Sequence, residues 1–413
     1  MSSEIIFYII IGLFVWEFIF SKTLDYLNTK NWSDKVPEEL SEIYDQKKYS
    51  KSMEYEKTKY NFWSITWVIS FVIMFLILVF GGFGWLDNLV RWFTDNYILR
   101  GLYFFWIITI FQTFIGIFTG YYSTFVIEEK FGFNKMTKKL FFIDIIKSFV
   151  LSLIIGWLLL WLIIWIYQIS GDNFWLYTWW VVTFFSVFMM MFYSSVIVPI
   201  FNKQTPLEEG ELRTAIQEFA TKVGFKLDNI YVIDWSKRSS KANAYFSGFG
   251  PKKRIVLYDT LIKDLETEEL VWVLAHEIGH YKRKHTFQML AFSIIQTWLM
   301  LFILWIALKY PEVSQALWAD EWSFWVWIIA FGILFTPISI VLWLFWNIMS
   351  RKNEYEADEF AGINYNPEKL KSALIKLSRN NLSNLRPHPA YEYFHYSHPT
   401  VLKRLKALSN IKK

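Results

Sequence analysis

The chain has 413 residues, of which 54% are hydrophobic and 21% aromatic. A soluble protein of this length does not need so much apolar surface, and a disordered chain cannot carry it. The absence of cysteine excludes disulfides, thiolate metal ligands and a cysteine nucleophile, and a net charge of +5 argues against a nucleic-acid partner. Most of the chain is therefore expected to lie in a membrane.

Seven stretches are long and apolar enough to cross a bilayer, which takes about 20 residues of helix. The first stretch lies close to the amino terminus but lacks a basic leader and a small-residue cleavage site, so we interpret it as a retained helix. The predicted spans are residues 5–21, 62–82, 101–121, 147–168, 174–198, 286–308 and 322–349.

Lysine and arginine are concentrated in every second connection between these spans. Because basic loops remain in the cytoplasm, this pattern places the amino terminus outside or in a lumen and the carboxyl terminus in the cytoplasm. The membrane is expected to be a bacterial inner membrane or that of the endoplasmic reticulum. The basic segments are residues 22–61, 122–146, 199–285 and 350–413.

The predicted fold is a mainly α polytopic membrane protein with a small α+β domain on its cytoplasmic side. Residues 1–198 hold the first five spans, and residues 286–349 hold the last two. Between them, residues 199–285 form an α+β segment, and residues 350–413 form a C-terminal helical segment that completes the cytoplasmic domain.

The α+β segment shows helical and strand patterns in turn. A helix over 207–223 is expected to end at Gly224. Another is expected to start with Thr267 as its N-cap and to run on through residue 285 toward the sixth span. Three strands are predicted between these helices, over 230–235, 243–248 and 254–258.

The sequence at 276–280, His-Glu-Ile-Gly-His, is the strongest chemical signal in the chain. Positions i and i+4 share one face of a helix, so His276 and His280 can bind one metal ion while Glu277 acts as the general base of a zinc peptidase. The alternative is a chance spacing on an amphipathic helix, which the presence of only six histidines makes rare.

A catalytic zinc ion needs a third protein ligand and one open position. The seventh span returns the chain to the side of His280, and the first acidic residue after it is Glu354. Asp358 shares its helix face and can orient a ligating imidazole. Glu356, on the opposite face, is the rival ligand, and a solvated acidic helix start is the other interpretation.

All six histidines lie between residues 276 and 398. His398 and Arg404 can stabilise the oxyanion of a tetrahedral intermediate, although polar residues on a basic tail would look the same. We expect His285 to lie at the membrane interface.

A strand candidate begins at Asn243, Ala244 and Tyr245, shortly before the metal-binding motif. An exposed edge strand here can pair with an extended peptide substrate. A buried hairpin strand would have the same pattern.

Further segments match one known family, at residues 125–135, 199–203, 205–207, 236–240, 243–246, 354–358, 381–385 and 395–400. In these segments and in the 276–280 motif, the sequence resembles the type I CAAX prenyl endopeptidases, which are integral-membrane zinc metalloproteases of the gluzincin type.

The resemblance implies seven helices around a water-filled chamber, with one zinc ion per chain at the cytoplasmic end. It implies His276, His280 and Glu354 as zinc ligands and Glu277 as the base. It also places Asp358 behind the ligands, and Asn243, His398 and Arg404 near the substrate or the oxyanion.

The expected partners are membrane lipid and a peptide or protein substrate, with or without a lipid modification. In eukaryotic members of the family the substrate is a prenylated C-terminal Cys-a-a-X sequence. The alternatives are a general quality-control protease and a non-catalytic chaperone or transport chamber with structural zinc, in which His398 would be a fourth ligand. The oligomeric state stays open.

Overall fold

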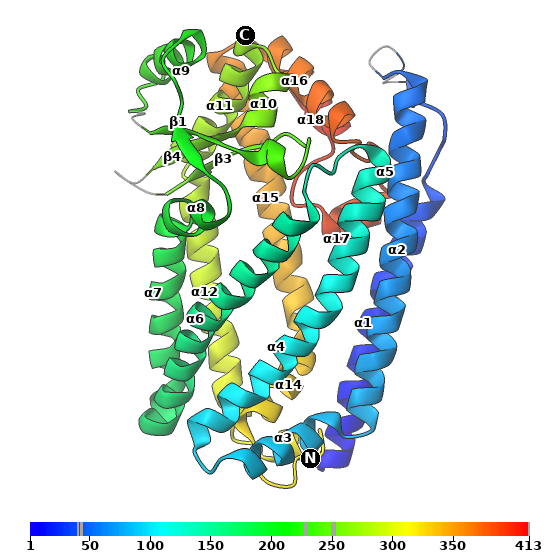
Figure 1. Cartoon of the computed structure of the whole chain (residues 1–413), viewed down its shortest axis with the longest axis vertical. Helices are drawn as coiled ribbons and strands as arrows, with labels where there is room; N and C mark the ends of the chain where they lie inside the picture. The colour runs from blue at the N-terminus through cyan, green and yellow to red at the C-terminus, as the bar shows by residue number, and fades with distance from the viewer. Residues whose placement is uncertain (39–40, 42–43, 227–228, 249–252, 412–413) are drawn as a thin grey trace.

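Long apolar helices form the elongated body of the molecule, and a small sheet with short helices covers one end of it (Figure 1). The computed structural model describes residues 1–38, 41, 44–226, 229–248 and 253–411. The amino and carboxyl termini lie at opposite ends of the long axis. The long helices are α1 (Ser3–Lys30), α2 (Gln46–Val79), α4 (Tyr97–Tyr122), α6 (Lys138–Ser170), α7 (Phe174–Phe192), α12 (His285–Ala307) and α15 (Thr336–Asn364).

At least five helices are membrane-spanning. Among the described residues, five are long and apolar enough, and the bent pair of α14 (Phe324–Leu334) and α15 raises the number to six. In this count the continuous helical stretch Lys138–Phe201, which contains α6 and α7, enters once.

The first, third, fourth and fifth predicted spans lie wholly within helical structure, whereas the second, sixth and seventh run past a helix end. Several helices also extend well beyond the apolar stretch. The α2 helix starts at Gln46 because the side chain of Asp45 accepts a hydrogen bond from the backbone N–H of Lys47. Thr137 caps α6 in the same way, by accepting from Leu140. Hydropathy locates only the part of a helix that faces lipid, so the predicted spans omit these polar first turns.

The predicted seventh span is wrong as a single helix, because α14 and α15 meet at an angle of 57°. Pro337 stands in the first turn of α15. Proline has no N–H to donate, and its ring clashes with the carbonyl four residues earlier, so an unbroken helix is not available here. The α15 helix then runs past residue 349 to Asn364.

A four-stranded sheet has the order β1-β2-β4-β3. The β2 and β4 strands pair in parallel, and the two outer pairings are antiparallel. All three predicted strands are confirmed, with β1 as an addition. The bounds are β1 (Gln204–Pro206), β2 (Ile230–Ile233), β3 (Ala244–Ser247) and β4 (Arg254–Tyr258).

The helix α11 (Thr267–Lys282) packs against this sheet and forms its core. Trp272 and Ile278 of α11 are fully buried in the same cluster as Ile255 and Leu257 of β4. The helix α9 (Glu211–Lys222) packs on α11, and its chain turns at Gly224, which has a φ of 61° and is the predicted helix end. This helix starts later than predicted because Leu207 still pairs with the sheet, donating to the carbonyl of Ile230.

Two expectations about α11 are wrong. Its N-cap is Glu266, which forms a reciprocal capping box with Glu269, and Thr267 is the first helical residue. The helix also does not run on into the next span. It ends at Lys282, the backbone turns at Lys284 with a φ of 59°, and α12 begins at His285.

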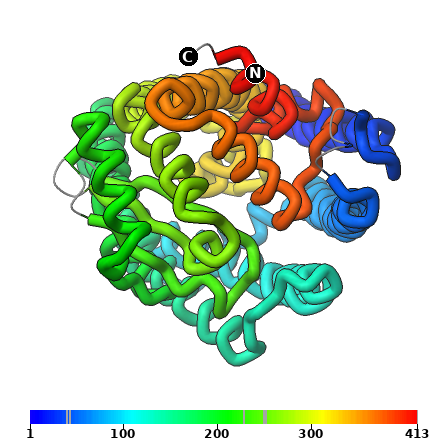
Figure 2. The backbone as a smooth tube through the Cα atoms, turned by 90° about the horizontal axis from the view of Figure 1, so that it is seen from above, coloured from blue at the N-terminus to red at the C-terminus, as the bar shows by residue number. Residues whose placement is uncertain are grey.

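The C-terminal segment covers the same end of the molecule as the sheet. Figure 2 looks onto this end, where the orange and red helices lie beside the green sheet-bearing segment. The contacts agree, since α16 packs on α11 and α18 packs on both α15 and α16. The remaining helices are α3 (Gly82–Phe93), α5 (Glu129–Phe131), α8 (Val198–Phe201), α10 (Asp259–Asp264), α13 (Glu312–Gln315), α16 (Pro367–Asn380), α17 (Pro389–His395) and α18 (Val401–Ser409).

Candidate metal centre

Three side chains from two helices converge at the end of the molecule that carries the sheet. His276 and His280 lie one turn apart on α11, and their Nε2 atoms are 3.1 Å from each other. Glu354 of α15 places one carboxylate oxygen 3.5 Å from His276 Nε2 and the other 3.3 Å from His280 Nε2. Among the described residues, this trio is the group of metal-ligating side chains with suitable spacing.

The separations fit a tetrahedral zinc ion. Zinc binds imidazole nitrogen and carboxylate oxygen at about 2.0–2.2 Å, so neighbouring ligand atoms of a tetrahedron lie about 3.3–3.6 Å apart. The three observed separations of 3.1, 3.3 and 3.5 Å are close to this range. Imidazole lone pairs and a carboxylate that face one another this closely repel unless a cation or protons lie between them.

Asp358 and Arg404 form the layer directly behind the trio. Asp358 is 1% exposed and accepts from His276 Nδ1 at 2.8 Å, which leaves His276 Nε2 free to face the metal position. The Arg404 guanidinium of α18 donates two hydrogen bonds to Asp358, of 2.6 and 2.8 Å, and its Nη1 is 3.4 Å from Glu354. The arginine thereby offsets two buried carboxylates.

The negative charge of this layer dominates the electrostatics of His276. Burial by itself would lower the pKa of His276, but Asp358 and Glu354 raise that pKa to about 10. Burial also opposes the charge of Arg404, yet Asp358, Glu354 and Glu277 raise the pKa of this guanidinium above its ordinary value. The site is therefore built to hold positive charge.

Glu277 and His398 lie around this core in different environments. Glu277 is half-buried on α11, between the two histidines. His398 precedes α18, and its Nδ1 is 3.0 Å from a carboxylate oxygen of Glu354 while 65% of its side chain is exposed. An imidazole in this position touches the ligand set and is still open to an incoming molecule.

The segment from Asn243 to Tyr245 leads into an edge strand. β3 pairs antiparallel with the next strand, β4, and contacts α11, and among the described residues no strand pairs with its other edge. The four residues of β3 are half-buried, so β3 is a hairpin strand that lies at the edge of the sheet. The side chain of Asn381 anchors the start of this strand by bonding to both the N–H and the carbonyl of Ala242, each at 3.3 Å.

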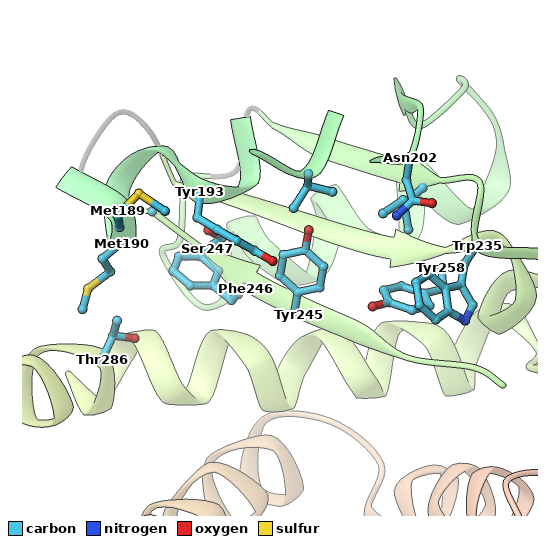
Figure 3. A pocket seen from close by; sticks show the side chains of 13 residues that line it. Met189, Met190, Tyr193, Asn202, Trp235, Tyr245, Phe246, Ser247, Tyr258 and Thr286 are labelled. Atoms are coloured by element: carbon cyan, nitrogen blue, oxygen red, sulfur yellow. The ribbon is translucent and has the colours of Figure 1, made fainter. Parts of the chain in front are cut away.

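A cavity of about 710 Å³ lies beside β3 (Figure 3). Its walls are mostly aromatic and methionine side chains, and Thr286 at the start of α12 forms part of it. The hydroxyl of Tyr245, one of the lining residues, lies 3.3 Å from the buried Ser194 Oγ. The side chains that define it include Met189, Met190, Tyr193, Tyr245, Phe246 and Tyr258.

His285 and Glu356 make contacts that the sequence did not indicate. His285 is 2% exposed and bonds to His280 Nδ1, so its side chain is buried within the protein. Glu356 does not join the metal-ligating trio and instead bonds to His285. The only sequence signal for His285 is that a third histidine follows His280 by five residues.

Comparison with known proteins identifies the family. Residues 25–203 match the family described as CAAX prenyl protease N-terminal, five membrane helices, and residues 206–412 match peptidase family M48. The CAAX prenyl protease 1 of Saccharomyces cerevisiae is 34% identical to this chain, over 98% of it and 95% of the yeast protein. The CAAX prenyl protease 1 homolog of Homo sapiens is also 34% identical, over 91% of this chain and 89% of its own.

A solved structure agrees with these relatives. The crystal structure of Ste24p from S. mikatae has a TM-score of 0.91 with this fold, 32% sequence identity and 99% coverage of each chain. The chain therefore belongs to peptidase family M48 and is a multi-pass membrane metalloendopeptidase related to the CAAX prenyl proteases.

Proposed function

We propose that this chain is a zinc endopeptidase that cleaves prenylated C-terminal Cys-a-a-X sequences at the metal centre of His276, His280 and Glu354. The observation that carries the proposal is the convergence of these three ligands, backed by Asp358 and Arg404. The names of the relatives support the substrate class.

The residues around the ligands support hydrolysis. His276, His280 and Glu354 would hold a zinc ion, whose Lewis acidity would polarise the scissile carbonyl and acidify the attacking water. Glu277 takes the proton from that water and delivers it to the leaving amine. His398, exposed beside Glu354, donates to the oxyanion as it forms, and Arg404 holds Asp358 and Glu354 in place.

An open fourth position distinguishes this proposal from structural zinc. A structural site is closed by four protein ligands. In the described part of the chain the cluster has three, and His398 is hydrogen-bonded to the ligand Glu354 rather than grouped with the trio. This arrangement favours a peptidase over a non-catalytic chamber.

We propose that the substrate backbone pairs with the free edge of β3, starting beside Asn243 and Ala244. Main-chain pairing would fix an extended peptide next to α11 without a preference for its sequence. The cavity beside Tyr245 then receives an apolar group of the substrate, because its walls are largely aromatic and methionine side chains.

We further propose seven spans with the metal site in the cytoplasm, and the domain boundaries predicted from the sequence. Termini at opposite ends of the molecule support an odd number of crossings. The stretch Lys138–Phe201 has 64 residues, about 96 Å as one straight helix, and therefore serves better as two spans, α6 and α7. The basic connections then all fall on one side.

A central chamber is part of this proposal. Only 6–17% of the residues in the apolar window of each candidate span are buried within the protein. Helices packed directly around a solid core would bury more of their surfaces. Low burial therefore supports a hollow bundle.

The decisive experiment compares two peptides that are identical except for a prenyl group on the cysteine. The purified full chain should cleave the prenylated peptide with the higher kcat/KM and release its last three residues. Zinc chelation should abolish this activity, and zinc should restore it. Equal cleavage of both peptides would point to the general quality-control protease, and no cleavage by zinc-loaded protein would reject the enzyme assignment.

A further inference from the structure

A chain of three polar groups leads from the metal ligand His280 to the surface of α15. His280 Nδ1 is 2.9 Å from His285 Nδ1, and His285 Nε2 is 3.1 Å from a carboxylate oxygen of Glu356. The His285 ring is 2% exposed and meets the His280 ring at 73°. Neither His285 nor Glu356 belongs to the ligand trio.

The proton positions in this chain have one consistent assignment when His280 binds a metal through Nε2. His280 Nδ1 then carries the proton and donates to His285 Nδ1. His285 must carry its own proton on Nε2, which donates to Glu356. Each bond thus has one donor and one acceptor, and the ionised Glu356 fixes the tautomer of both rings.

The backbone break between α11 and α12 makes this contact. On an unbroken helix, residues five apart are separated by about 140° around the axis and do not face each other. Lys284 has a φ of 59°, a conformation that residues other than glycine rarely adopt, and it separates α11 from α12. His285 therefore faces back toward His280.

The two ligands of the motif are thus supported in different ways. His276 is held directly by the carboxylate of Asp358, whereas His280 has a second imidazole between itself and its carboxylate. We propose that His285 and Glu356 are positioning residues for the zinc ligand His280, forming a His-His-Glu relay that holds its Nε2 toward the metal.

Retention of the metal tests the relay directly. Hydrogen-bonding partners of metal ligands typically change metal affinity by about 10- to 100-fold. Zinc should leave the full-length H285A protein for a chelator about 10- to 100-fold faster than it leaves the parent, and the visible spectrum of the cobalt-substituted protein should change. E356A should act in the same direction, and kcat should fall more than KM rises.

Two variants separate positioning from simple structural damage. E356Q keeps a carbonyl oxygen that accepts from His285, so it should retain zinc to within about threefold of the parent. E359A is the matched control, because Glu359 lies one turn along α15 and pairs with Arg283 beside the same backbone break, but is exposed. It should behave as the parent does.

A double-variant comparison covers the case in which H285A does not fold. The amide oxygen of H285N can still accept from His280, but the link to Glu356 is lost. Adding E356A to H285N should therefore change zinc release no further, and an additive loss would overturn the relay. Release of zinc from H285A as slow as that from E359A would overturn it as well.

The inference rests on the proposed zinc site but not on its substrate. If the parent protein holds zinc but cleaves no peptide, the proposed function is wrong. The rates of zinc release from the variants would still test the relay. A parent that binds no zinc would overturn both.

Discussion

Gly279 of α11 packs directly against the backbone of Ala357 on α15. A Cβ atom at residue 279 would lie 3.1 Å from both the Cα and the carbonyl oxygen of Ala357, which is closer than most such contacts allow. Ala357 is fully buried. This contact lets the two helices approach closely enough for His276, His280 and Glu354 to share one ion.

We therefore expect G279A to separate α11 from α15 and weaken metal binding. Overpacking of this kind costs about 1–3 kcal/mol, partly offset by the better helix propensity of alanine. Zinc retention against a chelator and the thermal unfolding temperature should both fall. G156A is the control, because a Cβ at Gly156 on α6 meets nothing within 4 Å. Equal behaviour of the two variants would contradict the argument.

Replacement of Glu277 by glutamine should leave the metal in place and remove the base. Glu277 is outside the ligand trio, and a positioned general base contributes about 100- to 10,000-fold. We expect kcat to fall by this amount while zinc stoichiometry, measured by elemental analysis, stays at that of the parent. Activity equal to the parent's would show that another group removes the proton.

Loss of Arg404 should destabilise the protein as well as the site. R404A leaves the buried Asp358 and Glu354 without their cation, and removing one partner of a buried ion pair costs about 3–5 kcal/mol. Zinc binding should partly restore the unfolding temperature, since the metal supplies positive charge. K406A is a nearby control, because Lys406 is exposed on the same helix α18. If R404A were as stable as the parent, Asp358 and Glu354 could not both be ionised in the folded protein.

The side chain of Asn381 should act on substrate binding through the backbone of β3. N381A removes both hydrogen bonds to Ala242 and so loosens the start of the edge strand. We expect KM to rise several-fold with little change in kcat, because the metal ligands are not touched. Asn380, which bonds to Asp264 at the surface, provides the adjacent control N380A. A fall in kcat alone would argue against pairing of the substrate with β3.

The stability of the folded protein should depend on pH through the buried carboxylate of Glu269. It is 1% exposed, and although burial favours the neutral form, hydrogen bonds from Lys376 and Ser372 lower the pKa of Glu269 below 4.5. The folded state therefore favours the ionised carboxylate. Its contribution to stability is complete above the unfolded pKa and is lost as the pH falls through the lower, folded pKa.

The variant E269Q should accordingly unfold at a lower temperature than the parent at neutral pH. The difference should stay constant down to about pH 5 and shrink below that, close to the unfolded pKa of glutamate. E218Q, at an exposed position of α9, should show little difference at any pH. If the difference in unfolding temperature between E269Q and the parent grew as the pH fell, the pKa of Glu269 would be raised in the folded state, not lowered.

The sequence by itself determined the features that depend on neighbouring residues. The apolar stretches located the membrane helices because about 20 residues cross a bilayer. The i, i+4 spacing placed His276 and His280 on one face because a helix has 3.6 residues per turn. The segment after the last span supplied Glu354, but local pattern left Glu356 as its rival.

Only the tertiary structure decided between those two carboxylates and placed the remaining groups. The crossing of α11 and α15 at Gly279 turns Glu354 toward the histidines, while Glu356 meets His285 instead. The turn at Lys284 depends on packing between distant segments, which periodicity along the chain does not record. The bend before α15 instead has a local cause, Pro337, which hydropathy does not register. For the same reason, β3 is recognised as an edge strand only once the order of the sheet is known.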